Sequence, residues 1–265
     1  MLKIKLFILY FLFCTFILSM GQNKAVIEVN YETKLIKDSL NRNNVQLMEY
    51  TLLSNENESY YFNRDAKQYY DALFGKSKPD ITNMVQTTMG SIPRYPRFTA
   101  SVYKVNNIVN ATLPVGRYNF TFPEPELKWE ILNQTKNIKN YKCQLAKTKT
   151  ENGDEFYAWF TNEIPIQDGP FRFKGLSGMV LEVYNKNKTI EIYATDIKKS
   201  TEQIDLIIYS NPISAKTKAE YLKARKAYYD DPSIYNGNIK VLDANGIDKT
   251  HKIIESLKRT NVFLD

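Results

Sequence analysis

Short segments in which apolar and polar residues alternate dominate the chain. Over residues 27–35 the odd-numbered positions are mostly apolar, and the even-numbered positions are mostly charged or polar. This period of two is typical of a β-strand with one buried face, because successive side chains of a strand point to opposite sides. Similar patterns predict strands over residues 46–54, 59–62, 99–105, 117–122, 141–145, 156–160, 179–184, 189–194, 204–208 and 239–242.

Polar turns separate several of these segments. Asn152-Gly153 stands between two of them and predicts a tight hairpin turn. The polar stretches 55–57 and 185–188 predict two further hairpin loops. Residues 76–97 contain several prolines and predict a long surface loop.

Only three segments have the features of helices. Segment 65–74 is followed by Gly75, which favours a helix end, and Asn63 or Arg64 stands near its start. Segment 215–229 follows Ser214, a candidate N-cap, and segment 251–258 carries a short apolar stripe.

This succession of local hairpins predicts a mainly β fold: an antiparallel curved sheet or half-barrel with two or three accessory helices (α+β). We expect the sheet to curve over a helix, and a closed barrel or a sandwich is the alternative. No repeat or long linker divides the chain. We therefore expect a single domain over residues 22–265, with a C-terminal helical extension from about residue 212.

The first 21 residues have the layout of a secretory signal peptide. Lys3 and Lys5 precede an apolar run over residues 6–18, and Ser19 and Gly21 provide small residues at a cleavage site. The run is shorter than the roughly 20 residues needed to cross a bilayer, which disfavours a membrane anchor. We expect residues 1–21 to be removed and no transmembrane segment to remain.

The composition narrows the possible chemistry. The chain has 19 Tyr and 14 Phe, but only one His and two Cys, which argues against a His-rich metal site, a multi-Cys zinc site and a disulfide scaffold. We expect no cofactor and no bound metal. Removal of the signal peptide would lower the net charge from +7 to +5, a mild excess compatible with anionic lipid or glycan nearby. We do not expect an exported protein of this kind to bind nucleic acid.

Residues 141–183 contain the most distinctive motif of the chain. Gly169-Pro170, followed by Gly175 and Gly178, indicates a loop that turns back into a strand, since glycine permits positive φ or close backbone approach. We expect this loop to dock Leu176 and Met179 into the core; the alternative is a loop at the mouth of an apolar cavity or at a partner-docking edge. The motif positions are Cys143, Trp159, Pro165, Gly169, Pro170, Phe173, Gly175, Leu176, Ser177, Gly178, Met179 and Val180.

These positions resemble the GLPGLI family of exported proteins of Bacteroidetes. The hexapeptide that names the family corresponds to residues 175–180, and Ser177, Met179 and Val180 replace the usual Pro, Leu and Ile. The resemblance is specific over about residues 127–185. It implies a protein of the periplasm, outer membrane or cell surface, and it implies no particular reaction.

Pairs of residues that could carry catalysis are few, and each has a simpler interpretation. Ser177 lacks the spacing of a nucleophile elbow, and its base would have to be His251, in a helix expected at the surface. Cys143 could pair with His251 in principle, but its alternating strand position favours burial. Glu124 and Glu126 flank a proline and are expected to be solvated rather than to act in proton transfer.

Two binding features also have simpler interpretations. Asp243 and Asp248 suggest a calcium loop, but Gly246 is misplaced for an EF-hand, and a tight turn is expected. The helix over residues 215–229 could bind an anionic membrane or glycan, but we expect a solvated face with a narrow apolar stripe against the sheet. Its basic residues are Lys216, Lys218, Lys223, Arg225 and Lys226, and its stripe is Ala219, Leu222 and Tyr229.

Without a catalytic constellation, the sequence predicts a non-enzymatic protein, and two roles remain open. The first is an exported protein that binds an apolar ligand or lipid on a curved, aromatic-rich sheet. The second is an envelope interaction module that docks to an outer-membrane or surface protein through a strand edge or the 76–97 loop.

Overall fold

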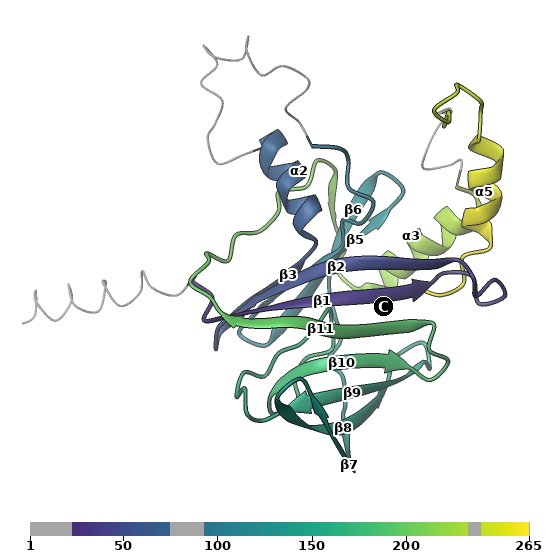
Figure 1. The fold of residues 1–265 in the computed structure, drawn as a ribbon. Helices are drawn as coiled ribbons and strands as arrows, with labels where there is room; N and C mark the ends of the chain where they lie inside the picture. Colours follow the sequence, from purple (N-terminus) through teal and green to yellow (C-terminus); the bar gives the residue numbers. More distant parts are fainter. Residues whose placement is uncertain (1–22, 75–92, 233–239, 265) are drawn as a thin grey trace, which may run out of the picture.

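The computed structural model describes residues 23–74, 93–232 and 240–264 (Figure 1). The signal peptide expected at residues 1–21 and most of the loop expected at 76–97 lie outside these ranges. The described chain forms one 12-stranded sheet with three helices, which confirms the mainly β fold with accessory helices. The helices are α2 (Arg64–Phe74), α3 (Lys218–Asp230) and α5 (Thr250–Lys258).

The sheet consists of two runs of antiparallel hairpins that meet at its middle. Its order is β12-β6-β5-β4-β3-β2-β1-β11-β10-β9-β8-β7. All neighbours are antiparallel except β12 and β6, which are parallel. The strands are β1 (Ile27–Ile36), β2 (Val45–Ser54), β3 (Glu58–Phe62), β4 (Ser101–Val105), β5 (Ile108–Val115), β6 (Tyr118–Pro123), β7 (Glu130–Ile138), β8 (Tyr141–Lys149), β9 (Glu155–Thr161), β10 (Met179–Asn185), β11 (Ile190–Lys199) and β12 (Pro212–Ser214).

The connection between β6 and β7 forces the sheet to curve. These strands are ten positions apart in the sheet order, which would separate them by about 48 Å in a flat sheet. The chain that joins Pro123 to Glu130 can span at most about 25 Å. The sheet must therefore curl until its two ends approach each other. In Figure 1, the direction of β5 and β6 is accordingly steeply inclined to that of β1 and β11.

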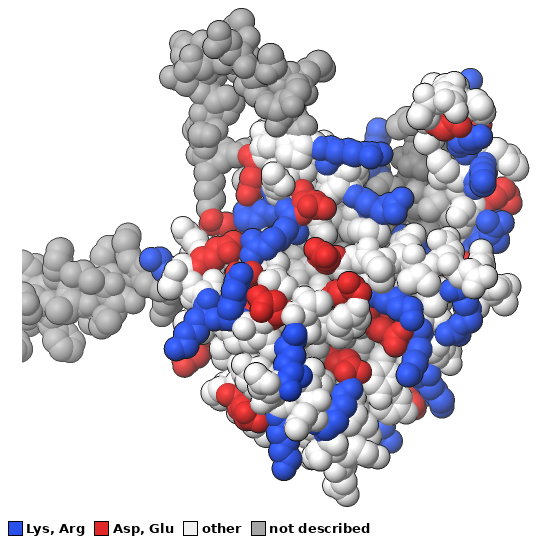
Figure 2. Space-filling view, in the orientation of Figure 1, with Lys and Arg blue, Asp and Glu red and all other residues white. Residues whose placement is uncertain are grey.

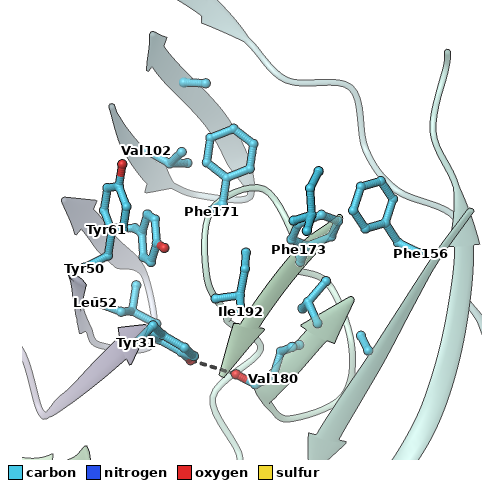
Figure 3. Close-up of a cluster of buried hydrophobic side chains, with 14 of the residues drawn as sticks. Tyr31, Tyr50, Leu52, Tyr61, Val102, Phe156, Phe171, Phe173, Val180 and Ile192 are labelled. Carbon is cyan, nitrogen blue, oxygen red and sulfur yellow. Dashed lines mark hydrogen bonds between the residues drawn. The ribbon is translucent and has the colours of Figure 1, made fainter. Parts of the chain in front are cut away.

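The main hydrophobic core fills the inner side of this curve. Tyr31, Tyr50 and Tyr61 line it from one half of the sheet, and Phe156 lines it from the other half (Figure 3). The space between them is filled by residues 162–178, the loop between β9 and β10, which carries the motif and is called the motif loop below. The curved sheet thus encloses a loop, together with Tyr221 and Tyr228 of α3, rather than a helix alone.

A second, smaller core lies on the opposite face of β2 and β3. Leu52 belongs to the main core and its neighbour Leu53 to the second core, as expected for alternating side chains. Helix α2 covers this face with Ala66 and Tyr70, and its N-terminus is capped by the side chain of Asn63, which accepts a hydrogen bond from the Ala66 amide at 2.9 Å.

Ion pairs cover much of the outer face of β1 and β11. Lys34 pairs with Glu191 at 2.7 Å, and Glu28 accepts from Arg64 and Lys198 at 2.8 and 3.1 Å. In the view of Figure 2, basic and acidic side chains are accordingly interspersed.

Several local predictions are wrong, and each has a physical reason. Residues 204–208 form no strand: Ile204 and Ile207 are buried while Leu206 is exposed, a spacing of three rather than two. Ser214 is the last residue of β12, so α3 begins later, and Thr217 is its N-cap.

Three strands were missed by the alternation pattern. β5 contains Pro114, which cannot donate to a strand ladder. β7 is an edge strand whose residues are mostly exposed, so it lacks the apolar alternation of a half-buried strand, and β12 has only three residues. The strand expected at 239–242 is limited to an isolated bridge between Leu242 and Asp248, and residue 239 lies outside the described ranges.

Candidate binding site at the motif loop

The motif loop is anchored in the core by aromatic and aliphatic side chains. Phe171 and Phe173 are fully buried, and Phe173 lies 4.8 Å from the ring of Phe156, centroid to centroid. Leu176 and Met179 are also buried, which confirms the expected docking. At the end of the loop, the Tyr31 hydroxyl donates a 2.7 Å hydrogen bond to the carbonyl of Val180 (Figure 3).

The glycines of the motif are required by close packing and by backbone conformation. A Cβ at Gly178 would lie 2.0 Å from the carbonyl oxygen of Thr161, and one at Gly169 would lie 2.3 Å from that of Phe173. Gly175 has φ +88° and open space around it. Two of the three glycines therefore allow backbone segments to touch, and the third allows a left-handed turn.

The other motif positions have structural surroundings. Pro165 and Ser177 are exposed, and the Ser177 hydroxyl donates to the Asn162 side chain at 2.8 Å. Pro170 is buried. Trp159 lies in β9 beneath the ammonium group of Lys136, 4.6 Å from its ring centroid.

A buried carboxylate, Asp168, ties the motif loop to the sheet. Its side chain accepts hydrogen bonds from the Gly169 amide at 2.8 Å and the Ser54 hydroxyl at 3.0 Å, and it pairs with Lys104 at 2.9 Å and with Lys174. Burial alone would raise the pKa of Asp168, but the two ammonium groups and the hydrogen bonds hold it well below its usual range. Burial lowers the pKa of Lys174, and Asp168 opposes that effect.

A second ion cluster lies beside the first. The guanidinium of Arg172 binds both carboxylate oxygens of Glu151, at 2.9 and 2.7 Å, and lies 3.2 Å from Glu124. Lys218 of α3 pairs with Glu124 at 2.9 Å. The hydrogen bonds from Arg172 lower the pKa of Glu151 to about 2. The loop is thereby joined to α3 and to the segment between β6 and β7.

A surface pocket of about 440 Å³ opens above these two clusters. Its wall combines apolar side chains of Ile108, Val109, Pro125 and Leu127 with buried Lys104, Glu124, Arg172 and Lys174. Exposed Asn107, Glu126, Gln167 and Gly175 complete it. Within the described ranges, no hydrogen bond or ion pair occupies the side chains of Asn107, Glu126 or Gln167, so these groups can receive a ligand.

The arrangement is suited to binding rather than to proton transfer at its buried acids. Asp168 accepts four donors, and Glu124 pairs with Arg172 and Lys218. The cationic partners favour the ionised form of Asp168, and its donors engage both of its carboxylate oxygens. The expectation that Glu124 is solvated is wrong, because its side chain is 1% exposed; Glu126 is exposed, as expected.

The remaining candidate residues do not form a catalytic site together. Cys143 is fully buried in β8, where burial raises its pKa to about 11. His251 lies on an exposed part of α5. Asp243 forms a tight turn, accepting from the amides of Asn245 and Ile247 at 2.9 and 3.0 Å.

The buried face of helix α3 differs from the expected stripe of Ala219, Leu222 and Tyr229. Its buried residues are Lys218, Tyr221 and Tyr228, whereas Ala219 is exposed. The aromatic ring of Tyr221 stacks on Phe122 at 4.3 Å. Lys218, which pairs with Glu124, thus belongs to the buried face of the helix. A search of the sequence for a stripe of apolar residues does not find such a lysine.

The described ranges contain no group of three or more His, Cys, Asp or Glu residues placed to hold a metal ion. None of the helices described is long and apolar enough to cross a membrane.

Comparison with protein families gives one match, over residues 124–221, to a model described as the N-terminal domain of the N-glycanase peptide. The search of curated proteins finds no match. The comparisons do not bear on the resemblance to the GLPGLI family or on export, which stay predictions.

Solved structures similar to the chain include two of PNGF-II. The crystal structure in space group P21 has a TM-score of 0.50 and 15% identity, and the alignment covers 76% of this chain and 33% of that chain. The structure in space group C2 has a TM-score of 0.49 and 16% identity with the same coverage. An uncharacterized conserved protein from Thermus thermophilus has a TM-score of 0.35 and 5% identity, with 76% of this chain and 99% of that chain covered.

These comparisons correct one prediction. The expectation that the chain is not an enzyme is overturned, because the matching family model describes a domain of an N-glycanase, an enzyme. The match covers the segment between β6 and β7, the motif loop and the start of α3. The chain is therefore similar, over the segment that builds most of the pocket, to the N-terminal domain of an N-glycanase, and it aligns with one third of the length of PNGF-II.

Proposed function

We propose that the chain serves a reaction that removes N-glycans, and that the pocket at the motif loop recognises the glycosylated polypeptide. One observation carries this proposal. The segment that matches the N-glycanase domain, residues 124–221, supplies eight of the twelve residues that line the pocket. The similarity is thus located where the structure offers a binding surface.

The chemistry of the pocket fits a polypeptide that carries polar substituents. Ile108, Val109 and Leu127 offer an apolar surface for side chains. The amides of Asn107 and Gln167 can both donate and accept, as a peptide group or a sugar hydroxyl requires. The wall therefore offers an apolar surface together with polar groups that can fix the orientation of a ligand.

The ion clusters give this pocket a rigid floor. Lys104 and Lys174 are held by Asp168, and Arg172 is held by Glu151 and Glu124. A site whose wall is already ordered loses less conformational entropy on binding. The buried charges therefore act in positioning, and the exposed groups make the contacts.

The test compares binding of the purified chain to an N-glycosylated protein and to the same protein after its glycans are removed. We expect measurable affinity for the glycosylated form and much weaker affinity for the other. Ile108→Glu should weaken binding at least about tenfold, because it places a charge on the apolar wall. Leu47→Glu in β2 is the matched control, since Ile108 and Leu47 are both 59% exposed. Equal binding to the two protein forms, or an unchanged affinity of Ile108→Glu, would contradict the proposal.

A second candidate function is binding of an apolar ligand or lipid. One observation favours it: a mostly apolar pocket of about 410 Å³ lies between β3–β6 and the segment 206–212, with Tyr60, Tyr103, Leu206 and Ile208 in its wall. Native mass spectrometry with lipid extraction tests it. We expect a stoichiometric apolar mass that is released on denaturation, whereas a ligand-free mass would favour docking to an envelope protein.

A further inference from the structure

A third pocket, of about 420 Å³, lies where several turns meet at one end of the sheet, near the right-hand ends of β1, β2, β10 and β11 in Figure 1. The loop between β1 and β2 contributes Ser39 and Arg42. The β8–β9 turn contributes Asn152 and Asp154, and the β10–β11 turn contributes Asn187. Arg225 of α3 and the C-terminal residues 261–263 complete the wall.

Hydrogen bonds within the wall fix the shape of this pocket. Asn185 closes the β10–β11 turn by accepting from the amides of Thr189 and Ile190 at 2.9 and 3.1 Å. Asn261 joins the C-terminal segment to the loop between β1 and β2, because its side chain accepts from the Ser39 amide at 2.9 Å and donates to the Ser39 hydroxyl at 2.8 Å. These bonds therefore tie the turns of the wall to one another.

Other polar groups of the wall are not used by the fold. In the part of the chain that the structure describes, no hydrogen bond or ion pair engages the side chains of Asn152, Asp154 or Asn187. Arg42 makes one hydrogen bond, at 2.9 Å, to the carbonyl of Asn187, and a guanidinium has five N–H donors. Two amides, a carboxylate and a guanidinium thus surround the same space and can both donate and accept.

An aromatic ring adds an apolar surface to this polar wall. Phe263 lines the pocket, and the guanidinium of Arg225 lies 3.9 Å from its ring centroid. Arg225 thereby stabilises the position of the ring. Such a wall is complementary to a molecule with hydroxyl groups and C–H groups on one ring. The polar side chains would bond the hydroxyl groups, and the aromatic ring would contact the C–H groups.

The charges of the wall narrow the class of ligand. The guanidinium groups of Arg42 and Arg225 would attract a phosphate or sulfate, but the carboxylate of Asp154 would repel it and would be left without a donor. An apolar ligand would leave the amides and the carboxylate desolvated without partners, at a high cost in free energy. A neutral polyhydroxyl ligand avoids both costs.

We propose that this pocket binds a neutral saccharide unit, with Asp154, Asn152 and Asn187 bonding its hydroxyls and Phe263 contacting its ring. This site is separate from the pocket at the motif loop, and the inference does not rest on the proposed function. Because the site is small and open to single sugars, free monosaccharides are adequate probes.

The test is a titration of the isotope-labelled full chain with mannose, galactose, glucose and N-acetylglucosamine, followed by NMR. We expect saturable shifts of amide signals in residues 152–154 and 185–190 with at least one sugar. Asp154→Ala and Asn187→Ala should each weaken that binding at least about tenfold, which corresponds to the loss of one or two hydrogen bonds to a charged or amide group. Glu56→Ala, at an exposed position between β2 and β3 that lines neither pocket, is the matched control and should leave the affinity unchanged.

Three results would overturn the inference. They are the absence of saturable shifts with all four sugars, binding that both Asp154→Ala and Asn187→Ala leave intact, and shifts produced by sulfate but by no sugar. The side chains of Asp154 and Asn187 are exposed, so the variants are expected to fold, and their melting temperatures check this. Ile108→Glu should weaken glycoprotein binding without changing sugar binding, so the two proposals can fail separately.

Discussion

Replacing Asp168 with asparagine should destabilise the protein more than any exposed substitution. The change keeps the size of the side chain and removes its charge. Lys104 and Lys174 then share a buried site with a neutral amide, and one of their acceptor oxygens becomes an NH2 group. Loss of one partner from a buried ion pair typically costs about 3–5 kcal/mol, because the remaining charge is left without compensation.

This cost translates into a measurable change of the melting temperature. A protein of this size loses about 2–4 °C per kcal/mol, so Asp168→Asn should melt about 6–20 °C below the wild type at pH 7. Asp154→Asn is the matched control: it makes the same chemical change at an exposed side chain and should alter stability by less than about 0.5 kcal/mol. Urea denaturation of the three proteins gives the free energies of unfolding directly.

The difference in stability between the wild type and Asp168→Asn should also depend on pH. Asp168 has a pKa below its unfolded value, so its contribution to stability is complete above the unfolded pKa of about 4 and is lost as the pH falls toward the folded value. The gap between wild type and Asp168→Asn should therefore be constant from pH 5 to 7 and shrink below about pH 4. A gap under about 1 kcal/mol at pH 7, given a cost of about 3–5 kcal/mol for an uncompensated buried charge, would refute the role assigned to Asp168.

Three further predictions concern the motif loop and β8. Gly178→Ala should cost about 3 kcal/mol or more in urea denaturation, because its Cβ would overlap a backbone oxygen, whereas Gly175→Ala should cost only about 1–2 kcal/mol for its positive φ; equal costs would contradict the packing. Tyr31→Phe should lower the free energy of unfolding by about 1–3 kcal/mol by leaving the Val180 carbonyl without its donor, and an unchanged value would show that water replaces the hydroxyl. Cys143 should react with a thiol reagent at pH 8 only after unfolding, since burial raises its pKa to about 11; rapid reaction of the native protein would be inconsistent with that burial.

The fold could largely be predicted from the sequence because its signals are local. The alternation over residues 27–35 identified β1, and Asn152-Gly153 identified the β8–β9 turn. The order of strands in the sheet could not be obtained this way. It depends on the pairing of β1 with β11, which joins residues far apart in the chain.

The binding site could be predicted only in part, for a related reason. The spacing of glycines indicated the motif loop, and burial of Leu176 and Met179 followed from it. Asp168, Arg172 and Glu124 were missed as a site, because a buried charge is identified by its partners, and those partners lie on other elements. The signal that could have indicated this site is the presence of Asp168, Arg172 and Lys174 in a short stretch that also contains two phenylalanines.

Hydrogen exchange of the full chain, with and without an N-glycosylated protein, shows whether the pocket at the motif loop recognises glycosylated polypeptide. We expect slower exchange in residues 104–109, 124–127 and 167–175 with the glycosylated form and no change with the same protein after glycan removal. Slower exchange confined to other parts of the chain, or the same protection by both forms, would contradict it.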